Sequence, residues 1–210
     1  MVWMLEARRV RAVVLSLLIF ISLFAGVGTF SGGAATQTAQ LDFSNIYNAD
    51  VVRGTADSTD GDFDNGGITL VSSSEAQNNG NSSDDGVPDD GVFPSKTDVH
   101  PKFELAAFNS NDNNAWQTTS TGSVTADVTH GQYETVHVIA SAGGAGPDTP
   151  AKFRMKLHYG DGSTHPSQEF TVPDWFGSPP NDPGYAVRDG MDRYNTNYGT
   201  YKDENEPGIW

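Results

Sequence analysis

The chain contains no cysteine among its 210 residues. This absence excludes disulfide bonds, thiol nucleophiles, zinc sites built from thiolates and lipid attachment to a cysteine. A hydrophobic core must therefore supply the stability of the folded chain, with salt or a bound metal ion as further aids.

Basic residues are scarce, with 12 Lys and Arg against 27 Asp and Glu and a net charge of −15. So large a negative excess repels nucleic-acid phosphate and anionic lipid, and no concentrated basic patch offsets it, so we expect no nucleic-acid partner. An acidic composition with few lysines resembles that of proteins from extreme halophiles. An ordinary acidic secreted protein, or a calcium-rich one, is the alternative.

Long apolar runs are missing except near the N-terminus. There the Arg8-Arg9 pair precedes an apolar run over residues 12–27, and the small residues Gly33-Ala34-Ala35 follow. This order predicts a signal peptide over residues 1–35 and a secreted or extracellular-surface protein, free of the membrane once the peptide is removed. The run has about 16 residues, and a membrane anchor needs roughly 20, which makes a retained anchor the weaker alternative. The two arginines leave the general and twin-arginine export routes both open.

Helical periodicity is absent from the rest of the chain. Apolar stretches there are short and rich in β-branched and aromatic residues, and clusters of Gly, Asn, Asp, Ser and Pro separate them. Several short strands with turns between them predict an all-β fold, an antiparallel β-sandwich of jelly-roll type. The stretches are 46–52, 68–71, 103–108, 124–128, 133–140, 153–159, 169–172 and 185–187.

The clearest strand signal is a hairpin over residues 153–176. Apolar and basic residues alternate over 153–159, which puts an apolar row on one face of a strand and a basic row on the other. Gly160-Asp161-Gly162 then turns the chain, because glycine reaches positive φ without a steric clash. Seven residues of this hairpin are predicted to build the core: Phe153, Met155, Leu157, Tyr159, Phe170, Val172 and Trp175.

These patterns divide the chain into four segments. We expect a signal peptide over 1–35, an N-terminal linker over 36–45, a β-sandwich domain over 46–194 and a polar tail over 195–210. The tail ends in Ile209-Trp210. These two large apolar residues either fold back onto the core or begin a last strand whose remainder is missing because the chain is truncated, and we favour truncation.

Acidic residues on a glycine-rich loop are candidate metal ligands. Asp60, Asp62 and Asp64 stand at alternate positions, and Gly61 lies between the first two. Calcium takes hard oxygen ligands from flexible loops, so these three aspartates are the candidate metal ligands and Ca²⁺ is the candidate ion. In a chain this acidic, solvated carboxylates are the alternative.

Tyrosines in polar sequence are candidate binding residues. Tyr194 and Tyr198 are predicted to be exposed, and sugar rings stack on exposed aromatic faces. Asp89 and Asp90, in a second acidic cluster, are candidate ligands for sugar hydroxyls. These four residues form the predicted ligand-binding set.

No catalytic arrangement stands out. The chain has no Gly-x-Ser-x-Gly motif, and its five histidines lack the context of a catalytic triad. A glycosidase needs two carboxylates about 5–10 Å apart, and nothing singles out a pair. The candidates are Glu104, Glu134, Asp161, Glu169 and Asp174. We assign no catalytic residue, and the sequence favours a noncatalytic protein.

Two segments carry a family resemblance. Residues 157–164, Leu-His-Tyr-Gly-Asp-Gly-Ser-Thr, followed by 172–176, Val-Pro-Asp-Trp-Phe, resemble β-sandwich modules of secreted carbohydrate-active proteins. Upstream, 61–67 and 87–93 resemble the Phe-Asp-Gly loop and the Leu-Pro-Asp-Asp-Gly segment of such modules. The resemblance runs from about Tyr47 to Tyr194. It implies an accessory, often noncatalytic module associated with glycoside hydrolases.

Three functions follow as hypotheses. The leading one is a secreted noncatalytic module that binds a glycan or supports a carbohydrate-active or cell-surface assembly. The second is a small secreted jelly-roll glycosidase that uses a carboxylate pair. The third is a structural cell-surface or filament subunit, in which a strand from a neighbour completes the sandwich.

Overall fold

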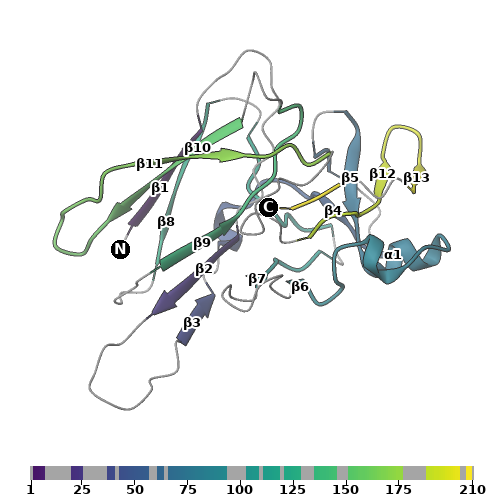
Figure 1. Cartoon of the computed structure of the whole chain (residues 1–210), viewed down its shortest axis with the longest axis horizontal. Coiled ribbons are helices and arrows are strands. Elements are labelled where there is room, and N and C mark those ends of the chain that lie inside the picture. The colour runs from purple at the N-terminus through teal and green to yellow at the C-terminus, as the bar shows by residue number, and fades with distance from the viewer. Residues whose placement is uncertain are drawn as a thin grey trace.

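Figure 1 shows the fold in the computed structural model of the protein. The structure describes residues 2–7, 20–25, 37–40, 43–56, 61–63, 66–93, 103–108, 111–118, 121–128, 135–145, 151–176, 188–203 and 207–209. Strands dominate these residues. Their α-helix, α1 (Ser73–Asn78), has six residues, and two 3₁₀ turns, η1 (Ser44–Ile46) and η2 (Ser83–Asp85), have three each. The predicted all-β class is confirmed at this level.

The first sheet is antiparallel and has the strand order β11-β10-β1-β8. Its strands are β1 (Val2–Ala7), β8 (Ser123–Asp127), β10 (Ala151–His158) and β11 (Gln168–Val172). The predicted hairpin is confirmed, because β10 pairs with β11 and the opposed rings of Phe153 and Phe170 stack with 5.0 Å between centroids. Tyr159 corrects the predicted core. It lies one residue past the end of β10 and is 37 % exposed.

The basic row of β10 meets an acidic residue on β11. Lys152 Nζ and Arg154 Nη2 lie 2.8 and 2.9 Å from the carboxylate of Glu169. The hydrogen bonds from Lys152 and then Arg154 lower the pKa of Glu169. The predicted alternation of apolar and basic faces is thus present in the folded strand.

The second sheet is mixed, with the order β13-β12-β5-β4. Its strands are β4 (Val52–Arg53), β5 (Ile68–Val71), β12 (Arg193–Asn195) and β13 (Thr200–Lys202). β4 and β5 pair in parallel, which the purely antiparallel prediction did not include. β13 lies within the predicted polar tail, so the folded part extends past the expected boundary at residue 194.

Two smaller sheets complete the described part. One has the order β3-β2-β9 and the other pairs two short strands. Their strands are β2 (Phe20–Ala25), β3 (Gln37–Gln40), β9 (Thr135–Ile139), β6 (Val92–Phe93) and β7 (Phe103–Glu104). β1 and β2 belong to the predicted signal peptide, and β3 belongs to the predicted linker. No helix among the described residues has the length and apolar character that a bilayer crossing requires.

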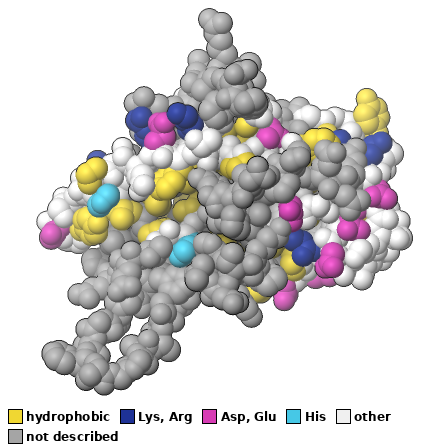
Figure 2. Space-filling view, viewed as in Figure 1, with side chains coloured by type: hydrophobic (Ala, Val, Ile, Leu, Met, Phe, Trp, Pro, Cys, Tyr) yellow, Lys and Arg dark blue, Asp and Glu magenta, His cyan; other side chains and the backbone are white. Residues whose placement is uncertain are grey.

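The core divides into two clusters of buried residues. The first contains Phe153, Ala126 and Val172 from the first sheet, together with Phe43 and Trp116. The second lies nearer α1 and is built around Trp175, whose indole stacks on Phe63 with 4.5 Å between centroids. Figure 2 shows acidic side chains spread over the end of the molecule that carries α1, opposite the first sheet in Figure 1.

The C-terminal residues 207–209 fold back onto the second core cluster. Ile209 is fully buried and exchanges two backbone hydrogen bonds with Arg188, at 3.1 and 2.7 Å. The Gly208 N–H donates to the carbonyl of Trp175 at 2.6 Å, and the buried Ser141 hydroxyl donates to the Gly208 carbonyl at 2.9 Å. Residues 207–209 therefore pack on the core in the structure. Trp210 lies outside the described residues.

Candidate functional site

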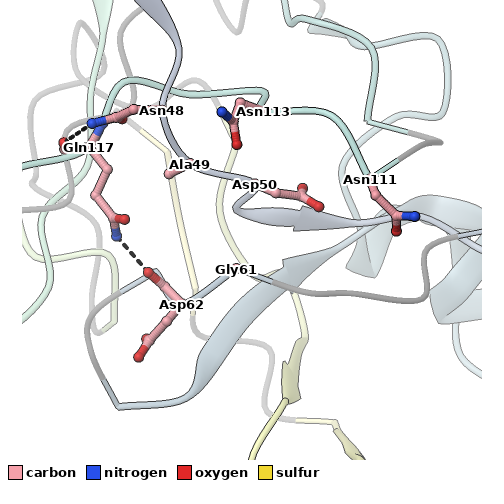
Figure 3. A pocket seen from close by; sticks show the side chains of 8 residues that line it. All are labelled: Asn48, Ala49, Asp50, Gly61, Asp62, Asn111, Asn113 and Gln117. Carbon is pink, nitrogen blue, oxygen red and sulfur yellow. Dashed lines mark hydrogen bonds between the residues drawn. The ribbon is translucent and has the colours of Figure 1, made fainter.

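A polar pocket opens where three segments distant in sequence meet (Figure 3). Its volume is about 330 Å³. The residues that line it are Asn48, Ala49, Asp50, Gly61, Asp62, Asn111, Asn113 and Gln117. Carboxamides and carboxylates dominate this lining, and none of the described lining residues is aromatic. The pocket therefore offers hydrogen-bonding groups rather than an apolar surface.

A short backbone pairing brings the first and third segments together. Ala49 and Ala115 form an antiparallel bridge, with N···O distances of 3.1 and 3.0 Å. The side chain of Asn48 extends this ladder. Its Nδ2 donates to the Gln117 carbonyl at 2.9 Å, and its Oδ1 accepts from the Gln117 N–H at 2.7 Å. The Asn48 amide thus replaces a peptide group in the pairing, which fixes its position on the wall.

Gln117 ties the second segment to the other two. Its Nε2 donates to the backbone carbonyls of Asp62 and Phe63, at 2.6 and 2.8 Å. Phe63 is fully buried against Trp175, so one end of this loop is anchored in the core. Asp62 is therefore held at the pocket in two ways. The Gln117 side chain donates a hydrogen bond to the Asp62 carbonyl, and the adjacent Phe63 is buried in the core.

The buried side chain of Asn114 supports the wall from behind. It is 1 % exposed. Its Oδ1 accepts from the N–H of Val51 at 2.9 Å, and its Nδ2 donates to Asp50 Oδ1 at 2.6 Å. The contact with Asn114 Nδ2 orients the carboxylate of Asp50. Asn114 thus positions Asp50 in the pocket, although Asn114 itself is not one of the lining residues.

Gly61 lies in close contact with the neighbouring segment. A Cβ at this position would stand 1.6 Å from the backbone carbonyl oxygen of Asp50. Real Cβ atoms do not approach an oxygen so closely, because van der Waals repulsion rises steeply at that distance. The site therefore needs glycine at 61 for the two segments to meet.

The predicted metal ligands are only partly placed. Asp62 lines the pocket, whereas Asp60 and Asp64 lie outside the described residues. Among the residues that are described, no group of three or more His, Cys, Asp or Glu side chains could hold a metal ion. Calcium binding by Asp60, Asp62 and Asp64 stays a prediction.

Asp89 and Asp90, whose binding of a ligand stays a prediction, both accept local hydrogen bonds. Asp89 accepts hydrogen bonds from the N–H and the hydroxyl of Ser74, at 3.1 and 2.7 Å, in the first turn of α1. Asp90 Oδ1 accepts from the N–H of Val92 at 2.9 Å and closes a turn. Neither residue belongs to the described lining of the pocket.

The two predicted tyrosine platforms differ in exposure. Tyr194 is half-buried, and the guanidinium of Arg53 covers its ring with 4.1 Å to the centroid. Tyr198 is 80 % exposed, in the turn between β12 and β13. The neighbouring Asn197 donates to the Gly66 carbonyl at 3.1 Å. Asn197 therefore links the turn of Tyr198 to Gly66.

Tyr201 and the buried Asp192 form a hydrogen-bonded pair. The Tyr201 hydroxyl donates to Asp192 Oδ2, which also accepts from Asn81 Nδ2 at 2.9 Å. Burial, followed by the hydrogen bond with Asp192, raises the pKa of the Tyr201 phenol above its ordinary value of 10.0. These contacts give Tyr201 a structural role.

We expect the free energy of unfolding to fall as the pH rises above about 10, because the unfolded chain then releases the Tyr201 proton while the native chain keeps it. Below that pH both states hold the proton, and the contribution of the pair is intact. Tyr201→Phe should lessen this fall, as measured by urea unfolding at about pH 9 and about pH 11. Equal losses in the variant and the parent chain would contradict the prediction.

Sequence reasoning missed most of the pocket. Of the lining residues it singled out Asp62 and, as a loop glycine, Gly61. The run Asn111-Asp112-Asn113-Asn114 just before Ala115-Trp116 was the available signal, because so polar a run beside an apolar pair marks a loop fixed to the core.

Comparisons with models of protein families, with curated proteins and with solved structures found no match for the chain.

Proposed function

We propose that this protein is a secreted, noncatalytic β-sandwich module of jelly-roll type that binds a glycan at the polar pocket. The lining of that pocket carries the proposal. Sites for apolar ligands are lined mainly by hydrophobic and aromatic side chains. Here four carboxamides and two carboxylates line the pocket instead: Asn48, Asn111, Asn113, Gln117, Asp50 and Asp62. Carboxamides donate and accept and carboxylates accept, which suits a ligand rich in hydroxyl groups.

The pocket walls are fixed before any ligand arrives. Asn48 is held by two hydrogen bonds to the backbone of Gln117, and Asp50 is held by Asn114. A preformed site loses little side-chain entropy on binding. Tyr198 adds an exposed ring on which a sugar could stack.

The remaining parts of the proposal rest on composition and on the N-terminal pattern. The apolar run after Arg8-Arg9 supports export with removal of residues 1–35, and the net charge of −15 supports function in concentrated salt. The partner is then an extracellular glycan or a cell-surface component that carries one. The resemblance of residues 157–176 to modules of carbohydrate-active proteins supports an accessory role beside a glycoside hydrolase.

Affinity electrophoresis of the exported protein through gels that contain soluble polysaccharides, in molar salt, tests the proposal. We expect at least one polysaccharide to retard the protein. Asp62→Asn should weaken this retention by about tenfold to a hundredfold, because a hydrogen bond to a charged group contributes about 1.5–3 kcal/mol. Asp127→Asn is the matched control, since it removes the same charge from an exposed position on β8.

Two results would overturn the proposal. One is unretarded migration of the parent protein with every polysaccharide tested. The other is equal retention of the Asp62→Asn and Asp127→Asn variants, because the pocket would then play no part. Release of reducing sugar ends from a retained polysaccharide would identify a glycosidase instead. In that case Asp50 and Asp62 are the carboxylates to test, because the pocket brings both to one place.

A further inference from the structure

Before any cleavage, residues 1–35 supply the middle strands of two sheets (Figure 1). β1 pairs with β10 over all six of its residues, from Val2 opposite His158 to Ala7 opposite Phe153. It also pairs with β8 over five residues. β2 lies in the same way between β3 and β9. Both strands are therefore hydrogen-bonded on both sides.

We propose that removal of residues 1–35 opens a strand-acceptor cleft between β8 and β10, and that this cleft receives a strand from a second copy of the chain. The inference rests on the removal of the signal peptide, which is part of the proposed function. Neighbouring strands lie about 4.8 Å apart, so β8 and β10 stand about 10 Å apart with room for one strand between them. Without β1, each presents an unpaired backbone edge, which readily pairs with another chain.

The register defines what the cleft accepts. Residues directly opposite each other in an antiparallel pair lie on the same face of the sheet. Positions 3, 5 and 7 of β1 stand opposite Leu157, Met155 and Phe153 on β10. Positions 3 and 5 also stand opposite Ala126 and Val124 on β8.

These five residues belong to the first core cluster or pack against it. Figure 2 shows hydrophobic side chains gathered over this end of the molecule. An occupant must therefore present an apolar residue at every second position and polar residues between them. This is the pattern of β-strand addition, in which backbone hydrogen bonds give affinity and alternate side chains give specificity.

The arm that processing sets free has an apolar residue at two of the three alternate positions that the cleft requires. Residues 36–42 read Thr-Gln-Thr-Ala-Gln-Leu-Asp, with Ala39 and Leu41 at alternate positions between polar residues. The arm contains β3, which loses its partner β2 at the same cleavage. Seven extended residues span about 23 Å, enough to cover the paired length of β1.

The topology favours exchange between two copies over insertion into the same copy. In the complete chain β3 is an edge strand of the sheet β3-β2-β9, a different sheet from the one that holds the cleft. Phe43, directly after the arm, is 1 % exposed and fixes its base in the core. Before cleavage β3 thus lies in a different sheet from the cleft of its own copy, and after cleavage a reciprocal exchange satisfies the clefts of both copies.

The full chain, expressed in a host that exports and processes it, tests this inference. The intact mass of the exported protein shows whether residues 1–35 are removed, and light scattering gives its mass in solution. We expect processed particles of at least two chains. An excess of a synthetic peptide with the sequence of residues 2–7 and a polar tail should convert them into single chains that each bind one peptide. A scrambled peptide should have no effect.

Two substitutions in the arm distinguish a damaged arm from a damaged cleft. Leu41→Asp should give single chains that still bind the peptide, because the arm is damaged and the cleft is intact. Gln40→Asp, its matched control on the polar face, should leave the multi-chain particles unchanged.

Processed single chains of the parent protein that do not bind the peptide would overturn the inference, because the sheet would then have closed on itself. Glycan retention measured on the same sample would leave the proposed binding function standing in that case. An exported protein that keeps residues 1–35 would overturn both the inference and the processing step on which it rests. The intact mass distinguishes these two failures.

Discussion

Replacing Trp175 by alanine is expected to lower the free energy of unfolding by about 3–5 kcal/mol, the usual loss for a large buried aromatic residue. The indole is 2 % exposed and stacks on Phe63. The backbone of Trp175 also connects two other segments, since its N–H donates to the Ala142 carbonyl at 2.8 Å and its carbonyl accepts from Gly208. A cavity at this position therefore loosens the junction between the core, the pocket loop and the C-terminal residues.

Chemical denaturation at constant salt measures this loss, with Tyr198→Ala as the control. Tyr198 is an aromatic residue that is 80 % exposed, so its truncation should change the free energy of unfolding by less than about 0.5 kcal/mol. Glycan retention should weaken in Trp175→Ala as well, because Phe63 adjoins Asp62. Similar denaturation midpoints for the two variants would show that the indole does not anchor this core.

The hairpin of β10 and β11 was predictable because its signals are local. Alternation gives the faces of a strand, and Gly162, with φ of 84°, provides the turn that the sequence indicated. The same alternation assigned Tyr159 to the core, and this was wrong. The alternation of apolar and polar residues in the sequence continues to Tyr159, whereas strand β10 ends at His158.

The pocket was not predictable in the same way because its parts come from distant segments. Asn48 and Gln117 meet only because Ala49 pairs with Ala115, and two alanines carry no signal for pairing. Tyr194 illustrates the same limit. Its polar sequence context indicated exposure, yet Arg53, far away in the sequence, covers its ring.

The strand pairing near the end of the chain could not be predicted from local composition. A polar stretch after residue 194 indicated a tail. Cross-strand pairing of Tyr194 with Tyr201, and of β12 with β5, nevertheless builds this stretch into a sheet. Ile209 is buried at the end of it. Composition reports the average environment of a segment, whereas strand pairing depends on which residues face a neighbour.

Replacing Gly61 by alanine is expected to lower the free energy of unfolding by about 3 kcal/mol and to abolish glycan retention. The added methyl group would lie 1.6 Å from the carbonyl oxygen of Asp50, a backbone atom that cannot rotate away. Overpacking of this kind usually costs about 1–3 kcal/mol, and contact with rigid backbone places Gly61 at the upper end. The strain must be relieved by moving Asp50, Asp62 or both, and each lines the pocket.

Gly162→Ala separates this steric effect from the loss of a glycine as such. No atom lies within 4 Å of a Cβ at position 162, so that variant bears only the strain of a positive φ, about 1–2 kcal/mol. Its turn is remote in sequence from the pocket segments, and we expect glycan retention to be unchanged. Gly61→Ala should therefore lose binding at a salt and denaturant concentration where Gly162→Ala keeps it. Should Gly61→Ala retain the polysaccharide while losing stability, the close contact between Gly61 and Asp50 would matter for folding alone, and the pocket would not be the binding site.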